Sequence, residues 1–300
     1  MAQKDLTEKY LELYPDVFAD IINALIYQGT QTVNPENLQP APTETLYSSK
    51  HGKLRNQFHD VSKYELDRGR IKVQYTLENE SKVKHRTVLR KAGYEGAVYR
   101  ERYEEGEVFP FVGILLFWGK GHWRAPTSLY QMLDNDFPKK EYIDNIHLHV
   151  YEMAHLPGEV RECFHSDMRI VVDYLAEGKD YVPSEQKIQH LEALLQMLNA
   201  LTGDDRYEEI FPALQEETEK TGGISMCELL DKYINKGREI GMAQGMAQGM
   251  AQGMAQGVAQ GMAQGMELAK RLIGDGRMED IPRAISDREY QNKLLKEYSL

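Results

Sequence analysis

Hydrophobic and polar residues alternate along two neighbouring stretches of the chain, near Phe58–Leu66 and Arg70–Asn79. A period of two residues is typical of a half-buried β-strand, because successive side chains point to opposite faces. Asp67-Arg-Gly69 separates the stretches and has the composition of a tight turn. The pattern therefore predicts a β-hairpin.

Helical spacing precedes and follows this hairpin. Leu6–Gln28 predicts a helix interrupted near Pro15, and Lys84–Glu104 predicts a second helix. From about residue 159 to residue 210 the apolar positions predict further helices. Thr30–Lys50 contains three prolines and little periodicity, so we expect a surface loop there.

Two later stretches predict further strands. Phe109–Trp118 is a short apolar run bounded by Pro110 and Gly119, which is typical of a buried central strand. Asn145–Met153 predicts another strand. A helix, two strands, a helix and more strands in this order predict an α/β fold with a mixed sheet flanked by helices.

The composition changes abruptly after Cys227. Residues 241–264 are six copies of GMAQ in which Val258 is the one departure, and Gly265-Met266 follows. Glycine costs about 1 kcal/mol relative to alanine in a helix, so an isolated helix here would be marginal. Two interpretations stay open: a helical ridge that forms an oligomer contact, which we favour, and a flexible spacer.

These patterns divide the chain into four parts. We expect a folded domain over residues 1–210, a helical linker over 211–240, the GMAQ repeat over 241–266 and a helical tail over 267–300.

Composition narrows the class of protein. The chain is 41% hydrophobic and 28% charged, and it contains neither an apolar leader nor a run long enough to span a membrane. Cys163 and Cys227 have no metal-ligand spacing and are expected to be reduced thiols. We therefore expect a cytoplasmic protein without a disulfide framework.

Charge is unevenly distributed along the chain. The net charge is −11, yet Lys50–Arg102 contains 14 Lys and Arg against 7 Asp and Glu. Such a basic segment is either a solvated charged face or a local binding surface for phosphate groups.

A pair of acids ends the second strand of the predicted hairpin. Glu78 and Glu80 are separated by one residue, so their side chains share a face and repel each other unless a cation or a positive neighbour lies between them. Pairing across the hairpin brings Asp60 into the same region. Carboxylate oxygens suit Mg²⁺ or Mn²⁺, although on these residues alone surface acids on hairpin strands are the favoured interpretation.

Several segments in order resemble a known family. The motifs are RNQFHDVSKY at 55–64, LENES at 77–81 and RKAGYEGAVYR at 90–100. Further matching segments are FPFV at 109–112, WRAPTSL at 123–129, FHSD at 164–167 and TGD at 202–204. Together they resemble the recombination-promoting nuclease family, also called YhgA-like transposases, within the PD-(D/E)xK nuclease superfamily.

The resemblance implies a Mg²⁺-dependent DNA endonuclease. It implies that Asp60 and Glu78 are catalytic residues that bind the metal, and that Glu80 is the third catalytic residue, at the position that orients the attacking water. It also implies a helper acid at Asp20. The cations expected to contact DNA are Lys82, Lys84, Arg86, Arg90 and Arg100.

The chain departs from the family pattern at Glu80, where relatives have glutamine or lysine. An ionised glutamate supplies neither a positive charge nor a donor. It could serve as an additional metal ligand or as a general base, or it could mark a lineage that has lost activity. The alternative function is therefore a DNA-binding or oligomeric module without catalysis, and a third interpretation is a scaffold organised by the GMAQ helix.

The remaining candidates have simpler interpretations. Arg90 and Arg100 could contact phosphate or pair with Glu95 and Glu104 on their own helix. Tyr94 and Tyr99 are expected in the core rather than as stacking platforms. The histidines, listed as His59, His122, His147 and His149, show no metal-ligand spacing and are expected to be structural.

Overall fold

The computed structural model describes residues 10–48, 54–58, 60–133, 140–203, 211–212, 214–215, 218 and 223–300. Contacts divide the chain into two compact units, Met1–Tyr233 and Ile234–Leu300. His59 and Asp204, which belong to motifs of the sequence analysis, lie outside the described residues. The finer division at 210, 240 and 266 stays a prediction.

The first unit is built on a five-stranded mixed sheet in the order β1-β4-β5-β6-β7. β1 pairs antiparallel with β4 and β4 with β5, whereas β5, β6 and β7 run parallel. The strands are β1 (Leu38–Pro40), β4 (Val61–Asp67), β5 (Arg70–Glu80), β6 (Phe111–Phe117) and β7 (His149–Glu152). The predicted α/β class with a mixed sheet is confirmed.

The predicted hairpin is the β4–β5 pair. Asp67 pairs with Arg70, which leaves a two-residue loop. Arg68 and Gly69 have φ of 50° and 78°. Positive φ at both loop positions matches the twist of the flanking strands, which is why such a turn closes a tight hairpin.

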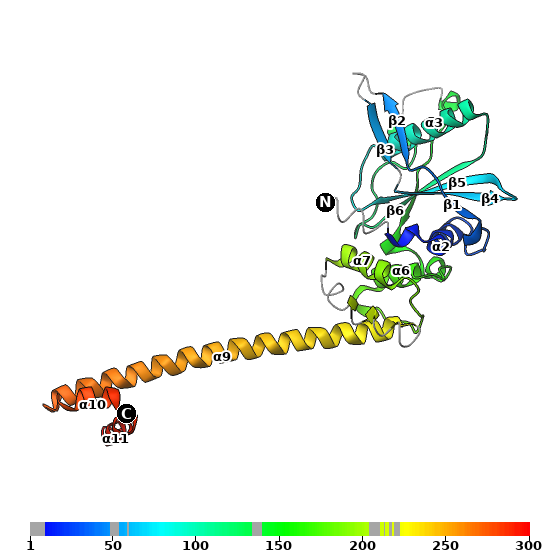
Figure 1. Ribbon diagram of the computed structural model, residues 1–300. Helices are drawn as coiled ribbons and strands as arrows, with labels where there is room; N and C mark the ends of the chain where they lie inside the picture. Colours follow the sequence, from blue (N-terminus) through cyan, green and yellow to red (C-terminus); the bar gives the residue numbers. More distant parts are fainter. Residues whose placement is uncertain are drawn as a thin grey trace. The chain divides into compact units, whose positions relative to one another are not determined.

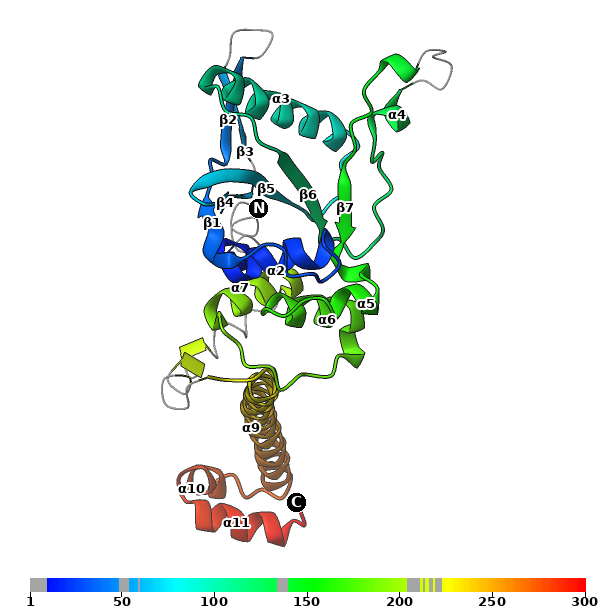
Figure 2. The same ribbon diagram turned by 90° about the vertical axis from the view of Figure 1, so that its right-hand side faces the viewer.

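Helices cover both faces of this sheet (Figures 1 and 2). On one face α2 (Pro15–Leu25) packs with α6 (Met168–Glu177) and α7 (Leu191–Thr202) around the main hydrophobic core. On the other face lies α3 (Thr87–Glu105). Tyr75 and Leu77 of β5 enter the main core, whereas the alternate residues of β5 face α3.

The face of the sheet under α3 is unusually polar. Arg102 of α3 is buried and donates to Gln74 of β5 at 2.6 Å. Its guanidinium also lies 3.8 Å from the ring centre of Phe109. Two apolar residues on this face, Val88 and Leu115, form a small separate core with β6 and β7. Thus α3 is held by charged contacts as well as by apolar packing.

The short elements complete the first unit. The 3-10 turns are η1 (Leu11–Leu13), η2 (Pro35–Asn37), η3 (Lys140–Tyr142), η4 (Met153–His155) and η5 (Gly178–Asp180), and the short helices are α4 (Leu129–Met132) and α5 (Gly158–Arg161).

Two sequence predictions about this unit are wrong in detail. The expected loop at Thr30–Lys50 contains η2, β1 and β2 (Glu44–Ser48). The expected single strand near Phe58–Leu66 is divided, because β3 (Leu54–Phe58) ends before β4 begins and pairs with β2 in a second sheet. The prolines that indicated a loop are compatible with β1, since an edge strand needs no amide donor on its outer side.

The long C-terminal helix α9 (Met226–Gly274) includes the whole GMAQ repeat, so the repeat is helical, whereas its role as an oligomer contact stays a prediction. The residues at the methionine positions of the repeat are 54–74% exposed. A Cβ added at any repeat glycine would meet no described atom within 4 Å. After α9, α10 (Asp280–Ser286) and α11 (Arg288–Glu297) fold back, and Leu268, Leu272, Ala284 and Leu294 form a small core.

Candidate functional site

Glu78 and Glu80 lie at the carboxyl end of β5 and point to the α3 side, as the alternation predicts. Their exposed fractions are 9% and 5%, so both carboxylates are largely removed from water. Asn79 points to the opposite side, where its amide oxygen accepts from the Trp118 indole at 2.6 Å and its amide nitrogen donates to Glu12 at 2.8 Å. These two contacts fix the orientation of the strand end and hence of both glutamates.

Asp60 lies immediately before β4, across the hairpin from the end of β5. Val61 pairs with Leu77, and Asp60 Oδ2 accepts the backbone N–H of Asn79 at 2.6 Å. Because Asn79 lies between Glu78 and Glu80, this bond brings the Asp60 carboxylate to the acid pair. The structure thus places Asp60 at the same end of the sheet as Glu78 and Glu80, although these three acids do not form a group whose ligand atoms all lie within 4.8 Å of one another.

Arg90 of α3 lies against both glutamates. Its Nη2 is 3.0 Å from Glu78 Oε2 and 2.5 Å from Glu80 Oε1, and Lys84 Nζ is 2.6 Å from Glu80 Oε2. Burial alone would lower the pKa of Arg90, but the two carboxylates outweigh burial and the pKa is raised. A positive neighbour therefore compensates the repulsion between Glu78 and Glu80.

Tyr94 lies one helical turn beyond Arg90 and is 5% exposed. Its pKa is raised to about 12, first by burial and then by the negative charge of Glu78, with smaller contributions from Asp60 and Glu80. The positive charge of Arg90 opposes this rise in the pKa but does not cancel it.

The space between β5 and α3 at this point is small. A cavity of about 10 Å³ is lined by residues that include Glu78, Lys91 and Tyr94. This volume is about that of one water molecule. A ligand larger than a water molecule therefore does not fit in this cavity.

The five cations expected to contact DNA divide into two groups. Lys84 and Arg90 are held by the acid pair, whereas Lys82, Arg86 and Arg100 are exposed. Arg90 does not pair with Glu95, which is five residues along α3 and therefore on another face of the helix, where Lys91 bonds it. Arg90 instead reaches the sheet.

The two tyrosines of α3 differ in burial. Tyr94 is buried as expected, but Tyr99 is 45% exposed, and its hydroxyl oxygen accepts the backbone N–H of Phe111 at 3.3 Å. The expectation that Tyr99 is a core residue is therefore wrong.

Asp20, the predicted helper acid, lies on the α2 side of the sheet and not with the other acids. It is 6% exposed, and its oxygens accept the backbone N–H groups of His165 and Ser166 at 2.8–3.0 Å and the Ser166 hydroxyl at 2.7 Å. These contacts anchor the segment before α6 to α2.

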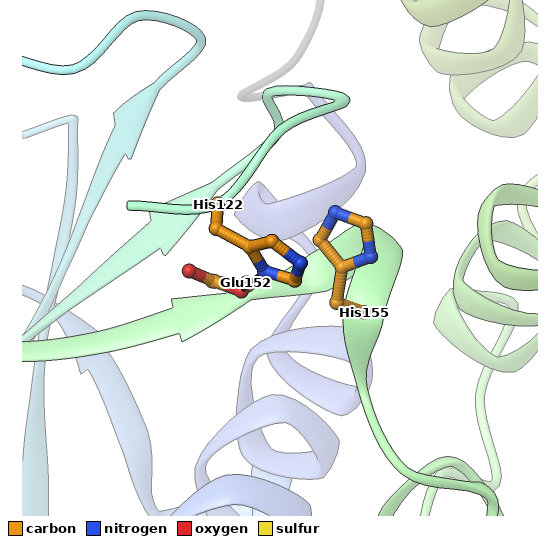
Figure 3. A group of neighbouring side chains, drawn as sticks. All are labelled: His122, Glu152 and His155. Carbon is orange, nitrogen blue, oxygen red and sulfur yellow. Dashed lines mark hydrogen bonds and ion pairs between the residues drawn. The ribbon is translucent and has the colours of Figure 1, made fainter. Parts of the chain in front are cut away.

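A second cluster, His122, Glu152 and His155, lies at the carboxyl ends of β6 and β7 (Figure 3). Glu152 Oε2 lies 2.7 Å from His122 Nδ1, and Glu152 Oε1 accepts the backbone N–H of Trp123 at 2.6 Å. Burial would raise the pKa of Glu152, but these two hydrogen bonds lower it below its usual value.

Sequence reasoning missed this cluster. His122 was expected to be structural, and its partners are 30 and more residues away along the chain. One signal was present: Glu152 and His155 are three residues apart, at the end of β7 and in the turn η4 that follows it directly.

Comparison with known proteins identifies no relative. No family model, no curated protein and no solved structure matches the chain. Within the part of the chain that the structure describes, no helix combines the length and the apolar character needed to cross a membrane.

Proposed function

We propose that the chain is a metal-dependent DNA endonuclease of the PD-(D/E)xK type, related to the recombination-promoting nucleases, which hydrolyses phosphodiester bonds with Mg²⁺ or Mn²⁺. The observation that carries the proposal is the position of Asp60, Glu78 and Glu80 at the same end of the sheet, where Asp60 bonds the backbone between the two glutamates. The order of α2, the β4–β5 hairpin, α3 and the parallel strand β6 agrees with the mixed sheet that the resemblance implies.

The donor set fits Mg²⁺ or Mn²⁺. These ions bind through one or two carboxylates and complete their coordination with water and phosphate oxygens. Asp60 and Glu78 supply two such carboxylates. The Nη2 of Arg90 already places positive charge against Glu78 and Glu80, so this point of the fold accepts a cation. The Arg90 side chain is 30% exposed and can turn outward when an ion takes its place.

The residues of the chain have separate roles in this proposal. Asp60 and Glu78 would hold the metal, which would supply an activated water and stabilise the charge of the phosphodiester under attack. Glu80, in contact with Lys84 and Arg90, acts as an acceptor and takes a proton from the water or joins the metal ligands.

We assign contact with the DNA substrate to the cations that do not pair with Glu78 or Glu80. Lys82, Arg86 and Arg100 are exposed on α3 and the segment before it, where they would contact phosphate without reading sequence. The strand end is the approach open to a backbone phosphate, since the space beneath α3 holds no more than about one water.

One observation favours the alternative, a DNA-binding or oligomeric module without catalysis. Arg90 neutralises the acid pair from within the chain, so the cluster is stable as an ion-pair network that needs no metal. Glu80 in place of glutamine or lysine agrees with this alternative as well.

Cleavage of supercoiled plasmid DNA tests the proposal. The wild type is incubated with Mg²⁺, Mn²⁺ or EDTA beside Glu78→Ala and Glu80→Gln. The matched control is Glu65→Gln, because Glu65 is also a buried strand carboxylate paired with a lysine, Lys72.

We expect metal-dependent nicking by the wild type and by Glu65→Gln. Glu78→Ala should lose nicking but keep its DNA affinity in a mobility-shift assay, because metal chemistry and phosphate contacts are separate. If Glu80→Gln alone is active, the chain is a disabled nuclease. If wild type and Glu80→Gln are both inert with either metal, the catalytic proposal fails and the alternative stands.

A further inference from the structure

The parallel strands bring three potential ligands together at one edge of the sheet. Phe117, the last residue of β6, pairs with Glu152, the last residue of β7, so the segment after β6 begins beside Glu152. This segment carries His122, and η4 directly after β7 carries His155 (Figure 3). One potential ligand atom from each of the three residues lies within 4.8 Å of the other two.

Backbone contacts orient two of these three side chains. The Trp123 N–H holds one oxygen of Glu152 and leaves the other toward His122. His155 Nε2 lies 3.1 Å from the carbonyl oxygen of Lys120, which leaves Nδ1 as its ligand nitrogen. Hydrogen bonds of this kind fix ring orientation and tautomer in metal sites.

An ordinary surface ion pair does not account for the whole cluster. The contact between His122 and Glu152 needs no third residue, and an exposed pair contributes about 0–1 kcal/mol. Yet the rings of His122 and His155 lie 4.3 Å apart with an interplanar angle of 32°. Two imidazoles beside one carboxylate repel each other when protonated but share a metal ion when neutral.

We propose that His122, Glu152 and His155 bind one divalent transition-metal ion of the Zn²⁺ class. Imidazole nitrogens favour Zn²⁺, Co²⁺ and Ni²⁺ over Mg²⁺, and two histidines with one carboxylate leave a fourth position open to a water or an anionic oxygen. The ion joins the segment after β6 to the end of β7. This site is independent of the proposed nuclease function and differs from the acid cluster in donor chemistry.

The site is also separate from the acid cluster in space. Glu80 pairs with Phe117, and Phe117 pairs with Glu152. Glu80 and Glu152 are therefore two strands apart at the same edge, about 10 Å between their backbones at the usual strand spacing. Substitutions can consequently address one site without touching the other.

The test is a titration of tag-free full-length protein with Zn²⁺, followed by calorimetry, and with Co²⁺, followed by visible absorption. We expect one ion per chain and a cobalt spectrum of nitrogen and oxygen ligands. His122→Ala and His155→Ala should each weaken binding by at least about tenfold, since loss of an outer-shell partner alone costs 10-fold or more.

Two variants serve as controls. His147→Ala removes another exposed histidine from the segment just before β7 and should bind as the wild type does. Glu78→Ala should also keep the ion, which separates this site from the acid cluster. Far-UV circular dichroism without metal checks that each variant is folded.

The proposal is overturned if the wild type binds no ion. It is also overturned if His122→Ala and His155→Ala both bind as tightly as His147→Ala, or if the cobalt spectrum has the intense near-ultraviolet bands of thiolate ligands, which would assign binding to Cys163 or Cys227.

Discussion

Replacing Arg90 by methionine removes a guanidinium that contacts two largely buried carboxylates. Glu78 and Glu80 are 9% and 5% exposed, and Lys84 would remain on Glu80. Removing one partner of a buried ion pair costs about 3–5 kcal/mol, and we expect the lower end because the Arg90 side chain is 30% exposed. A loss of about 3 kcal/mol corresponds to a fall in Tm of about 6–12 °C for a unit of this size.

Tryptophan fluorescence is a suitable assay for this change. Both tryptophans of the chain lie close to the site, since Trp118 donates to Asn79 and Trp123 packs edge-on against Phe117 at 5.3 Å between ring centres. Their signal therefore reports on the first unit and not on α9. The matched control is Arg100→Met, an exposed arginine of the same helix, which should change stability by no more than about 0.5 kcal/mol.

Metal dependence extends the measurement to the proposed function. If an ion can replace the guanidinium, Mg²⁺ should raise the Tm of Arg90→Met more than that of the wild type. The double variant Arg90→Met/Glu78→Ala should not respond in this way. An unchanged Tm for Arg90→Met would refute the charge compensation, and an equal response of the single and double variants would refute the metal site.

Three further predictions concern other parts of the chain. Asp20→Asn should lower the unfolding free energy by about 2–3 kcal/mol, because charged hydrogen bonds to residues 165–166 are lost. Nicking of DNA per folded molecule should be unchanged. Lost nicking at an unchanged Tm would instead support the helper-acid role of Asp20. Burial lowers the pKa of Lys63 below its usual value of 10.5. Between the lowered pKa and pH 10.5, Lys63 is therefore protonated more in the unfolded chain than in the folded chain. The unfolding free energy of the wild type should therefore rise with pH in this window, relative to that of Lys63→Met, by up to about 1.4 kcal/mol per pH unit. If urea unfolding gives the same pH dependence for both proteins, this prediction is wrong. Gly253→Ala should add about 1 kcal/mol of helix stability and slow amide exchange in the repeat about fivefold, and unchanged exchange would show that glycine does not limit this helix.

Short-range sequence patterns predicted the β4–β5 hairpin and the position of the acids at its end. The alternation along β5 gave the hairpin and the shared side of Glu78 and Glu80, because strand geometry alone fixes both. The pairing of Asp60 with this strand end followed from the turn at Arg68-Gly69. None of these inferences needed knowledge of the packing.

Long-range packing determines what the sequence did not predict. Arg90 is five residues from Glu95, so no local pair was available to it, and only the docking of α3 on the sheet decides that it contacts Glu78 and Glu80. The partners of Asp20 are about 145 residues away, so no local pattern indicated its anchoring role. Likewise the parallel register of β6 and β7 brings His122 to Glu152.

The GMAQ helix has a consequence for how this gene can change. A unit of four codons keeps the reading frame when it is gained or lost, and four is the whole number nearest to the 3.6 residues of a helical turn. From Met242 to Val258 the residues at the methionine positions are exposed, whereas Met262 and Met266 line a pocket with Ile281 and Ala284, so a copy gained or lost in the earlier part of the repeat leaves that pocket intact. The repeat is thus a segment whose length can change by whole copies while the helix itself continues without interruption.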